Sequence, residues 1–142
     1  METFPVILDH VFFTKMLVEA IPNHQHQPNH VIKHVPENNI HIHEHDDMKD
    51  DVYRFFSVTI KTSINKLAEV SDPYRIEFEA VGKFRVNKNQ TEEEISKGVT
   101  IVGHSVVYGS IREAILWTTS RQPFGPLNLG LSILKPSPQD LS

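Results

Sequence analysis

Two long segments of the chain alternate apolar and polar residues with a period of two. In residues 50–64 and again in residues 74–86, the even-numbered positions are mostly apolar. The apolar sets are Val52, Phe56, Val58, Ile60 and Ile64 in the first segment, and Tyr74, Ile76, Phe78, Ala80, Phe84 and Val86 in the second. This pattern predicts two antiparallel strands with one buried face, joined by a turn over residues 65–73. Gly82 interrupts the second row, which indicates a bulge or a close approach of another segment.

Residues 5–20 are apolar at both odd and even positions. A strand with two apolar faces must be covered on both sides, as in the centre of a sheet. The alternative is a strand at a subunit interface, and we favour it because a bare apolar edge of this length promotes aggregation.

Residues 21–39 have the composition of a long connection. Three prolines remove backbone donors and four asparagines favour turns. A connection of this length is either a binding loop or a mobile loop whose apolar residues rest on the nearest surface. Those apolar residues are Val31, Ile32 and Val35.

Residues 39–46 alternate two isoleucines with three histidines, which predicts a further strand. Ile40 and Ile42 share one face, and His41, His43 and His45 share the other. Alternate side chains on a strand lie about 6.6 Å apart, so neighbouring histidines are candidate zinc ligands. The alternative is a solvated strand face whose histidines become charged near pH 6.5. A second group, His24, His26, His30 and His34, lies in the preceding connection and allows the same two interpretations.

Residues 91–121 carry the signals of a long helix. Thr91 followed by three glutamates is typical of a capped N-terminus, and Gly98 predicts a pause before the helix continues to about Arg121. Pro123 prevents continuation. Beyond it, Leu127, Leu129 and Leu131 alternate with polar or small residues, which predicts an extended segment with one buried face.

Small residues along this helix, including Gly103 and Gly109, favour close packing. The packing partner is either a second helix across a subunit boundary or the sheet of the same chain. Because four predicted strands precede the helix, the fold class is α+β with an antiparallel sheet. The length of 142 residues is sufficient for a core and predicts a single domain over residues 1–142.

Composition excludes several classes of protein. The absence of cysteine excludes disulfides and thiolate metal sites, and a net charge of -4 without a basic cluster argues against nucleic-acid binding. The N-terminus does not read as a signal peptide and no apolar run is long enough to span a membrane, so we expect a cytoplasmic protein. We find no nucleophile with a base, no phosphate loop and no cofactor motif, which predicts a binding protein rather than an enzyme.

The segment Arg112–Leu129 reads R-E-x-I-x-x-x-T-x-R-x-x-F-x-P-L-N-L. It is similar to the end of the long helix and the following segment in the bacterial export chaperone SecB and in SecB-like chaperones of toxin–antitoxin systems. Thr14-Lys15, Asp50–Tyr53 and Gly82–Phe84 follow the order of that family. The resemblance implies a four-stranded antiparallel sheet followed by a long helix. We expect the second C-terminal helix of the family to be missing, because residues 135–142 contain two prolines, which predicts a flexible tail.

The resemblance also implies a function. SecB-like proteins are oligomeric holdases that capture unfolded preproteins or an antitoxin without ATP, and their crossover loop, here residues 21–39, forms one wall of the client groove. The corresponding client-binding candidates are Val31, Ile32, Val35, Ile40, Ile42, Leu131, Ile133 and Leu134. Self-association as a dimer or a dimer of dimers is expected.

Docking on the motor ATPase SecA, which the resemblance also implies, depends on acidic residues of the sheet. Two positions that are acidic in the export chaperone hold Met16 and Ala20 here, which leaves Glu19 and Glu79 as candidates. The alternatives are therefore a chaperone dedicated to one antitoxin or partner without SecA docking, and a metal-binding protein that uses its histidines.

Overall fold

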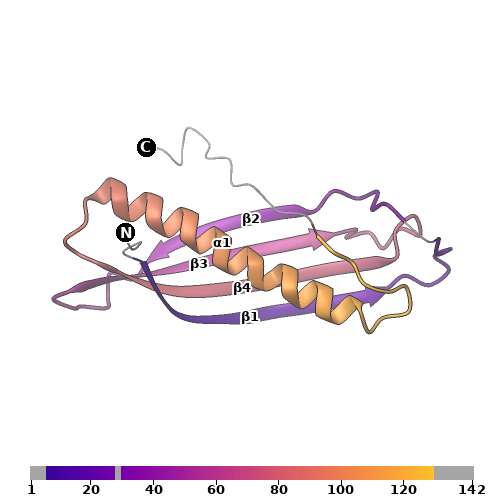
Figure 1. The fold of residues 1–142 in the computed structure, drawn as a ribbon, viewed down its shortest axis with the longest axis horizontal. Coiled ribbons are helices and arrows are strands. Elements are labelled where there is room, and N and C mark those ends of the chain that lie inside the picture. Colours follow the sequence, from indigo (N-terminus) through magenta and orange to yellow (C-terminus); the bar gives the residue numbers. More distant parts are fainter. Residues whose placement is uncertain (1–5, 28–29, 130–142) are drawn as a thin grey trace.

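Four antiparallel strands form one sheet, and one long helix lies diagonally across one of its faces (Figure 1). The computed structural model describes residues 6–27 and 30–129. The strands are β1 (Val6–Ala20), β2 (Glu37–Glu44), β3 (Tyr53–Ile64) and β4 (Tyr74–Asn87), and the helix is α1 (Glu92–Thr119). The strand order is β1-β4-β3-β2. The predicted α+β class, with an antiparallel sheet followed by a long helix, is therefore confirmed.

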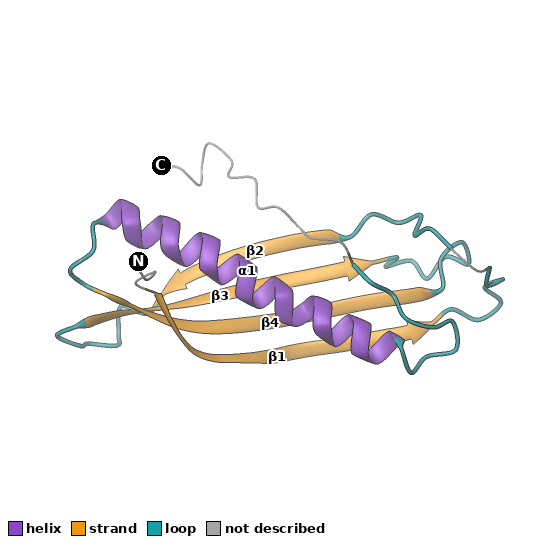
Figure 2. Cartoon of the chain, viewed as in Figure 1, coloured by secondary structure: helices purple, strands orange, loops and turns teal. Residues whose placement is uncertain are grey.

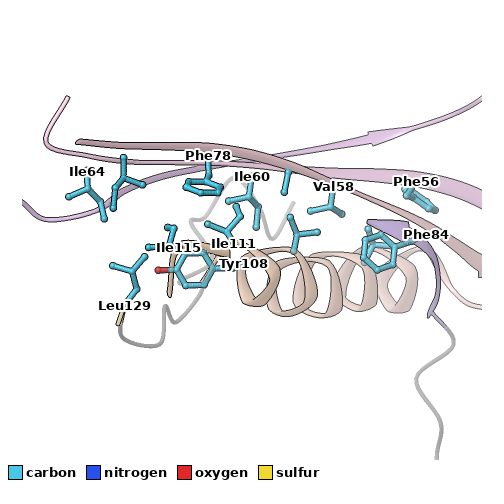
Figure 3. Close-up of a cluster of buried hydrophobic side chains, with 14 of the residues drawn as sticks. Phe56, Val58, Ile60, Ile64, Phe78, Phe84, Tyr108, Ile111, Ile115 and Leu129 are labelled. Carbon is cyan, nitrogen blue, oxygen red and sulfur yellow. The ribbon is translucent and has the colours of Figure 1, made fainter. Parts of the chain in front are cut away.

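The core lies between α1 and the inner face of β3 and β4 (Figure 3). The even-numbered residues of both strands point toward the helix, as the period of two predicted. The helix contributes side chains at helical spacing, namely Ile95, Val99, Val107, Ile111 and Ile115. The opposite face of the sheet has no second layer within the described residues (Figure 2).

Strand β1 is an edge strand, paired only with β4 in the described part of the chain. Its register shifts between Leu8 and His10 and again between Phe13 and Lys15. Each shift inserts one extra residue into β1. Beyond each shift, the odd-numbered and even-numbered residues therefore exchange faces of the sheet. The side chains facing α1 are therefore Val6 and Leu8, then Val11 and Phe13, then Met16 and Val18. The two bulges explain part of the apolar pattern at both parities, whereas Ile7, Phe12 and Leu17 lie on the opposite face of the sheet.

Helix α1 begins at the predicted cap, where Thr91 Oγ1 accepts a hydrogen bond from the Glu94 backbone N–H at 3.1 Å. The predicted pause at Gly98 is wrong, because the helix is continuous to Thr119. Gly98 serves packing instead, since a Cβ there would lie 3.0 Å from Val6 Cγ2 of β1. Gly103 lies against Val58 of β3, so this glycine packs on the sheet and not on a second helix.

The chain turns sharply after α1 and returns along the core. Tyr74 of β4 holds this turn, because its hydroxyl donates to Gly125 O at 2.7 Å and accepts from Phe124 N–H at 3.1 Å. Leu129 is buried, while residues 125–129 form no strand. The extended path with a buried leucine is thus present as far as Leu129.

Strand β2 begins at Glu37, two residues before the predicted start at Asn39. It forms the second edge of the sheet and pairs with β3 from Glu37↔Ser63 to Glu44↔Phe56. The connection from β1 crosses the end of the sheet to reach it. We call residues 21–36 the crossover loop. Among the described residues, no helix has both the length and the apolarity needed to cross a membrane.

Candidate functional site

A groove of about 440 Å³ separates β2 from the N-terminal half of α1. Its apolar lining comes from both elements and from β3, and consists of Ile40, Ile42, Phe56, Ile95 and Val99. Its polar lining is His41, Glu44, Arg54, Glu92, Ser96 and Thr100. An apolar surface beside an edge strand suits an extended peptide, whose alternate side chains can enter the groove.

Arg54 closes one end of this groove with a network of charged hydrogen bonds. Its Nε and Nη2 donate to the two oxygens of Glu44 at 2.8 and 2.7 Å, and its Nη1 donates to Glu92 at 2.6 Å. The hydrogen bond from Arg54 lowers the pKa of the Glu44 carboxyl. These bonds connect β2, β3 and the first turn of α1, so they link the two walls of the groove. Sequence analysis did not identify Arg54, because its partners are distant in the chain.

The client-binding candidates of the crossover loop differ in exposure. Val31 and Val35 are 80% and 83% exposed, whereas Ile32 packs partly buried against the core. On β2, Ile40 is partly exposed and Ile42 contacts the core cluster. The remaining candidates, Leu131, Ile133 and Leu134, lie outside the described residues.

The crossover loop is attached to the turn between β3 and β4 by the carboxylate of Asp72. The Asp72 side chain is 1% exposed and accepts hydrogen bonds from the backbone N–H groups of Lys33 and His34 and from the rings of His30 and His34. Burial by itself would raise the pKa of Asp72, but these hydrogen bonds together lower it to about 2. The nearby His24 ring contacts Val70 O through Nδ1 at 2.6 Å. Sequence analysis assigned Asp72 only to the turn over residues 65–73 and did not predict its contacts with the crossover loop.

A second groove, of about 770 Å³, lies between β1 and the C-terminal half of α1. Its lining includes Val11 and Phe13 of β1 and the exposed Trp117, over which the Arg121 guanidinium lies at 3.8 Å from the ring centre. The edge of β1 alongside exposes further apolar side chains, namely Ile7, Leu8 and Met16. An edge strand with exposed apolar residues on both faces is suited to pairing with another chain.

His43 of β2 and His45, which follows the strand, lie on the outer face of the sheet, whereas His41 also lines the groove beside α1. His45 Nε2 hydrogen-bonds Ser57 Oγ and lies 3.3 Å from Lys83 Nζ. Burial and the charge of Lys83 both lower the pKa of His45. Among residues 6–27 and 30–129, no three His, Asp or Glu side chains converge to hold a metal ion. His24, His30 and His34 instead have protein partners in the crossover loop region.

Both motor-binding candidates lie on this outer face and are engaged in local contacts. Glu79 accepts from Thr14 Oγ1 at 2.6 Å and lies 3.3 Å from Lys61 Nζ, and these contacts lower its pKa. Glu19 lies 3.5 Å from Arg75. The outer face therefore carries a ladder of paired charges.

No protein-family profile matches the chain, and no curated protein sequence does. Solved structures do share its fold. It is similar to the Rv1957 SecB-like chaperone of Mycobacterium tuberculosis, solved in complex with a ChAD peptide from the Rv1956 HigA1 antitoxin. The TM-score is 0.57 at 18% identity, over 90% of this chain and 88% of that chain.

It is also similar to a protein of unknown function from Streptococcus agalactiae, with a TM-score of 0.55 and 11% identity, over 92% of this chain and all of that one. At sequence identities this low, the similarity is one of fold. Together with the strand order and the long helix described above, it shows that this chain has the fold of the SecB-like chaperones.

Proposed function

We propose that the protein is an ATP-independent holdase that binds extended, non-native segments of other polypeptides. The observation that carries this proposal is the apolar groove between β2 and α1. The crossover loop, which precedes β2, adds the exposed Val31 and Val35 outside the groove lining. A neighbour of the same fold was solved with an antitoxin peptide bound. Such a protein acts by binding alone, in the cytoplasm, and needs neither a cofactor nor a catalytic group.

The physical basis is the burial of client side chains. An unfolded segment exposes apolar groups, and burying them against the groove contributes about 25 cal/mol per Å². Ordering the segment opposes this gain, so a single short contact is weak. Several grooves on one assembly raise the effective concentration of each further contact, which converts weak contacts into stable capture. The proposal therefore includes self-association, as a dimer or a dimer of dimers.

The test is suppression of client aggregation without nucleotide. A purified sample is expected to suppress light scattering by an unfolding client at stoichiometric concentration. The double variant Val31→Ser/Val35→Ser is expected to bind a client peptide about tenfold more weakly, because about 1.4 kcal/mol of apolar burial is removed. Val52→Ser is the matched control, since Val52 is exposed at the start of β3, away from the crossover loop. Failure to suppress the aggregation of any client would refute the proposal.

A second candidate keeps the fold and narrows the client to one antitoxin or one partner protein. The antitoxin peptide bound to the M. tuberculosis neighbour favours it. The two candidates differ in selectivity. A dedicated chaperone binds one cognate peptide at least a hundredfold more tightly than unrelated unfolded segments, whereas a general holdase binds them with similar affinity. Titration of a peptide panel by fluorescence anisotropy separates these outcomes.

Delivery of clients to SecA would require docking on the outer face of the sheet. Glu19 and Glu79 are the acids proposed for this contact, and both are engaged by neighbouring groups of the same chain. The export role therefore predicts that Glu19→Gln/Glu79→Gln weakens SecA binding while client binding is unchanged. No detectable SecA binding by the wild-type protein would leave the antitoxin-type role.

A further inference from the structure

Two carboxylates enclose a single imidazole where the crossover loop meets the β3–β4 turn. The Nδ1 of His34 lies 2.5 Å from Asp72 Oδ2, and its Nε2 lies 2.6 Å from Glu69 Oε2. On the other side of the same carboxylate, His30 Nε2 lies 2.9 Å from Asp72 Oδ1. The imidazole of His34 thus bridges the loop to two acids of the turn.

This geometry requires a particular protonation state. Ionised carboxylates only accept hydrogen bonds, and a neutral imidazole carries a single N–H donor. Both ring nitrogens of His34 face carboxylate oxygens, so both bonds can exist together only in the imidazolium form. Loss of one proton leaves a ring nitrogen lone pair facing a carboxylate oxygen, which is repulsive.

We propose that His34 is a proton-dependent latch of the crossover loop: as imidazolium it fastens the loop to the β3–β4 turn, and on deprotonation it releases that contact. All groups of the latch belong to this chain, so the latch does not depend on a client. Its consequence for clients rests on the proposed function, because the fastened loop carries the exposed client-binding candidates Val31 and Val35.

The charged groups around His34 favour its protonated form. Asp72 and Glu69 face it from the turn, Lys33 adjoins it in the loop, and Lys66 of the turn is paired with Glu37 of β2 at 3.2 Å. The hydrogen bond with Asp72 and then that with Glu69 raise the pKa of His34, and burial opposes them only in part. The neighbouring His30 ring packs edge-on against His24, with 5.1 Å between ring centres, and does not contact Glu69.

The direction of the pH dependence follows from these shifts. Because the pKa of His34 is raised in the folded state, its contribution to the latch is complete below the ordinary value of 6.5 and is lost as the pH rises through the raised value. The pKa of Asp72 is lowered to about 2, so its contribution is complete above 3.8 and is lost as the pH falls toward 2. The loop is therefore held most firmly between these limits, and its attachment is weakened on the alkaline side.

NMR of the full chain without any client tests the latch directly. The His34 ring is expected to titrate above pH 6.5. Over the same transition, the hydrogen-exchange protection factors of the Lys33 and His34 backbone N–H groups, which donate to Asp72, should fall together. The fall should be about tenfold for each unit by which the measured pKa of His34 exceeds 6.5.

Three variants make the assignment specific. His34→Gln should abolish the change in protection of the Lys33 N–H between pH 6 and 9. Glu69→Gln removes one exposed carboxylate and should move the transition to lower pH. His43→Gln, at an exposed position of β2 outside the groove, should leave it unchanged. A constant protection factor across the His34 titration, or a transition that persists in His34→Gln, would overturn the proposal.

Client binding is measured separately, so the two proposals fail in different ways. With a fluorescent unfolded peptide, the wild-type affinity is expected to fall above the His34 midpoint, and that of His34→Gln to be independent of pH. If the protein binds the peptide at none of the pH values tested, the holdase proposal is refuted and the latch proposal is unaffected. An unchanged wild-type affinity across the transition would refute regulation by the latch.

Discussion

At the scale of single residues, Gly82 shows how closely the sheet approaches the helix. A Cβ at this position would lie 2.6 Å from Phe84 Cε2 and 2.7 Å from Val107 Cγ2, and both of those side chains are fully packed in the core. Gly82→Ala is therefore expected to lower the free energy of unfolding by about 1 to 3 kcal/mol, measured by urea denaturation. Gly109 of α1 has open space around its position, so Gly109→Ala should stabilise by up to about 1 kcal/mol. Equal effects of the two substitutions would contradict this packing.

At the scale of elements, α1 is held by its first turn as well as by its buried face. Thr91 Oγ1 satisfies one of the free N–H groups of that turn, and the acidic residues that follow interact favourably with the positive end of the helix. Thr91→Ala should reduce the free energy of unfolding by about 1 kcal/mol, whereas Thr91→Asn, which retains a capping oxygen, should reduce it little. Thermal unfolding, monitored by circular dichroism, distinguishes the two variants. Equal losses of stability in both would show that the capping hydrogen bond is unimportant.

At the scale of the whole molecule, the edge of β1, which pairs only with β4 among the described residues, is the surface best suited to self-association. Met16 on this edge is 58% exposed, and Met48 in the β2–β3 turn is 50% exposed. Since charge on an edge strand opposes edge-to-edge pairing, Met16→Lys should dissociate the assembly and Met48→Lys should not. Light scattering after size exclusion gives the mass, which for the wild type should be a multiple of 16.3 kDa. A wild-type monomer, or an assembly insensitive to Met16→Lys, would contradict the prediction.

The period of two in β3 and β4 and the Thr91 cap were predictable from the sequence because each depends on residues close together in the chain. The parity of β1 was not, because the two bulges that reverse it follow from pairing with β4, more than sixty residues away. Gly98 reads as a helix interruption in isolation, and only the approach of Val6 shows it to be a packing position.

The candidate site was predictable in the same partial way. Ile40 and Ile42, which line the groove, were selected from their apolar character and their places in the chain, whereas Val31 and Val35, selected in the same way, are exposed outside the groove lining. The groups that hold the site together, Arg54 and Asp72, were missed because each acts on partners brought close only by folding.

The sequence by itself determined which segments are strands, where the helix begins and ends, and which faces are apolar, because these depend on local backbone preference and hydrophobic period. The tertiary structure alone decided which strands lie at the edges of the sheet, which side of the sheet each β1 residue faces, and which carboxylates enclose His34. Those features depend on contacts between residues far apart in the chain, and such contacts form only after the strands have paired and the helix has packed on the sheet.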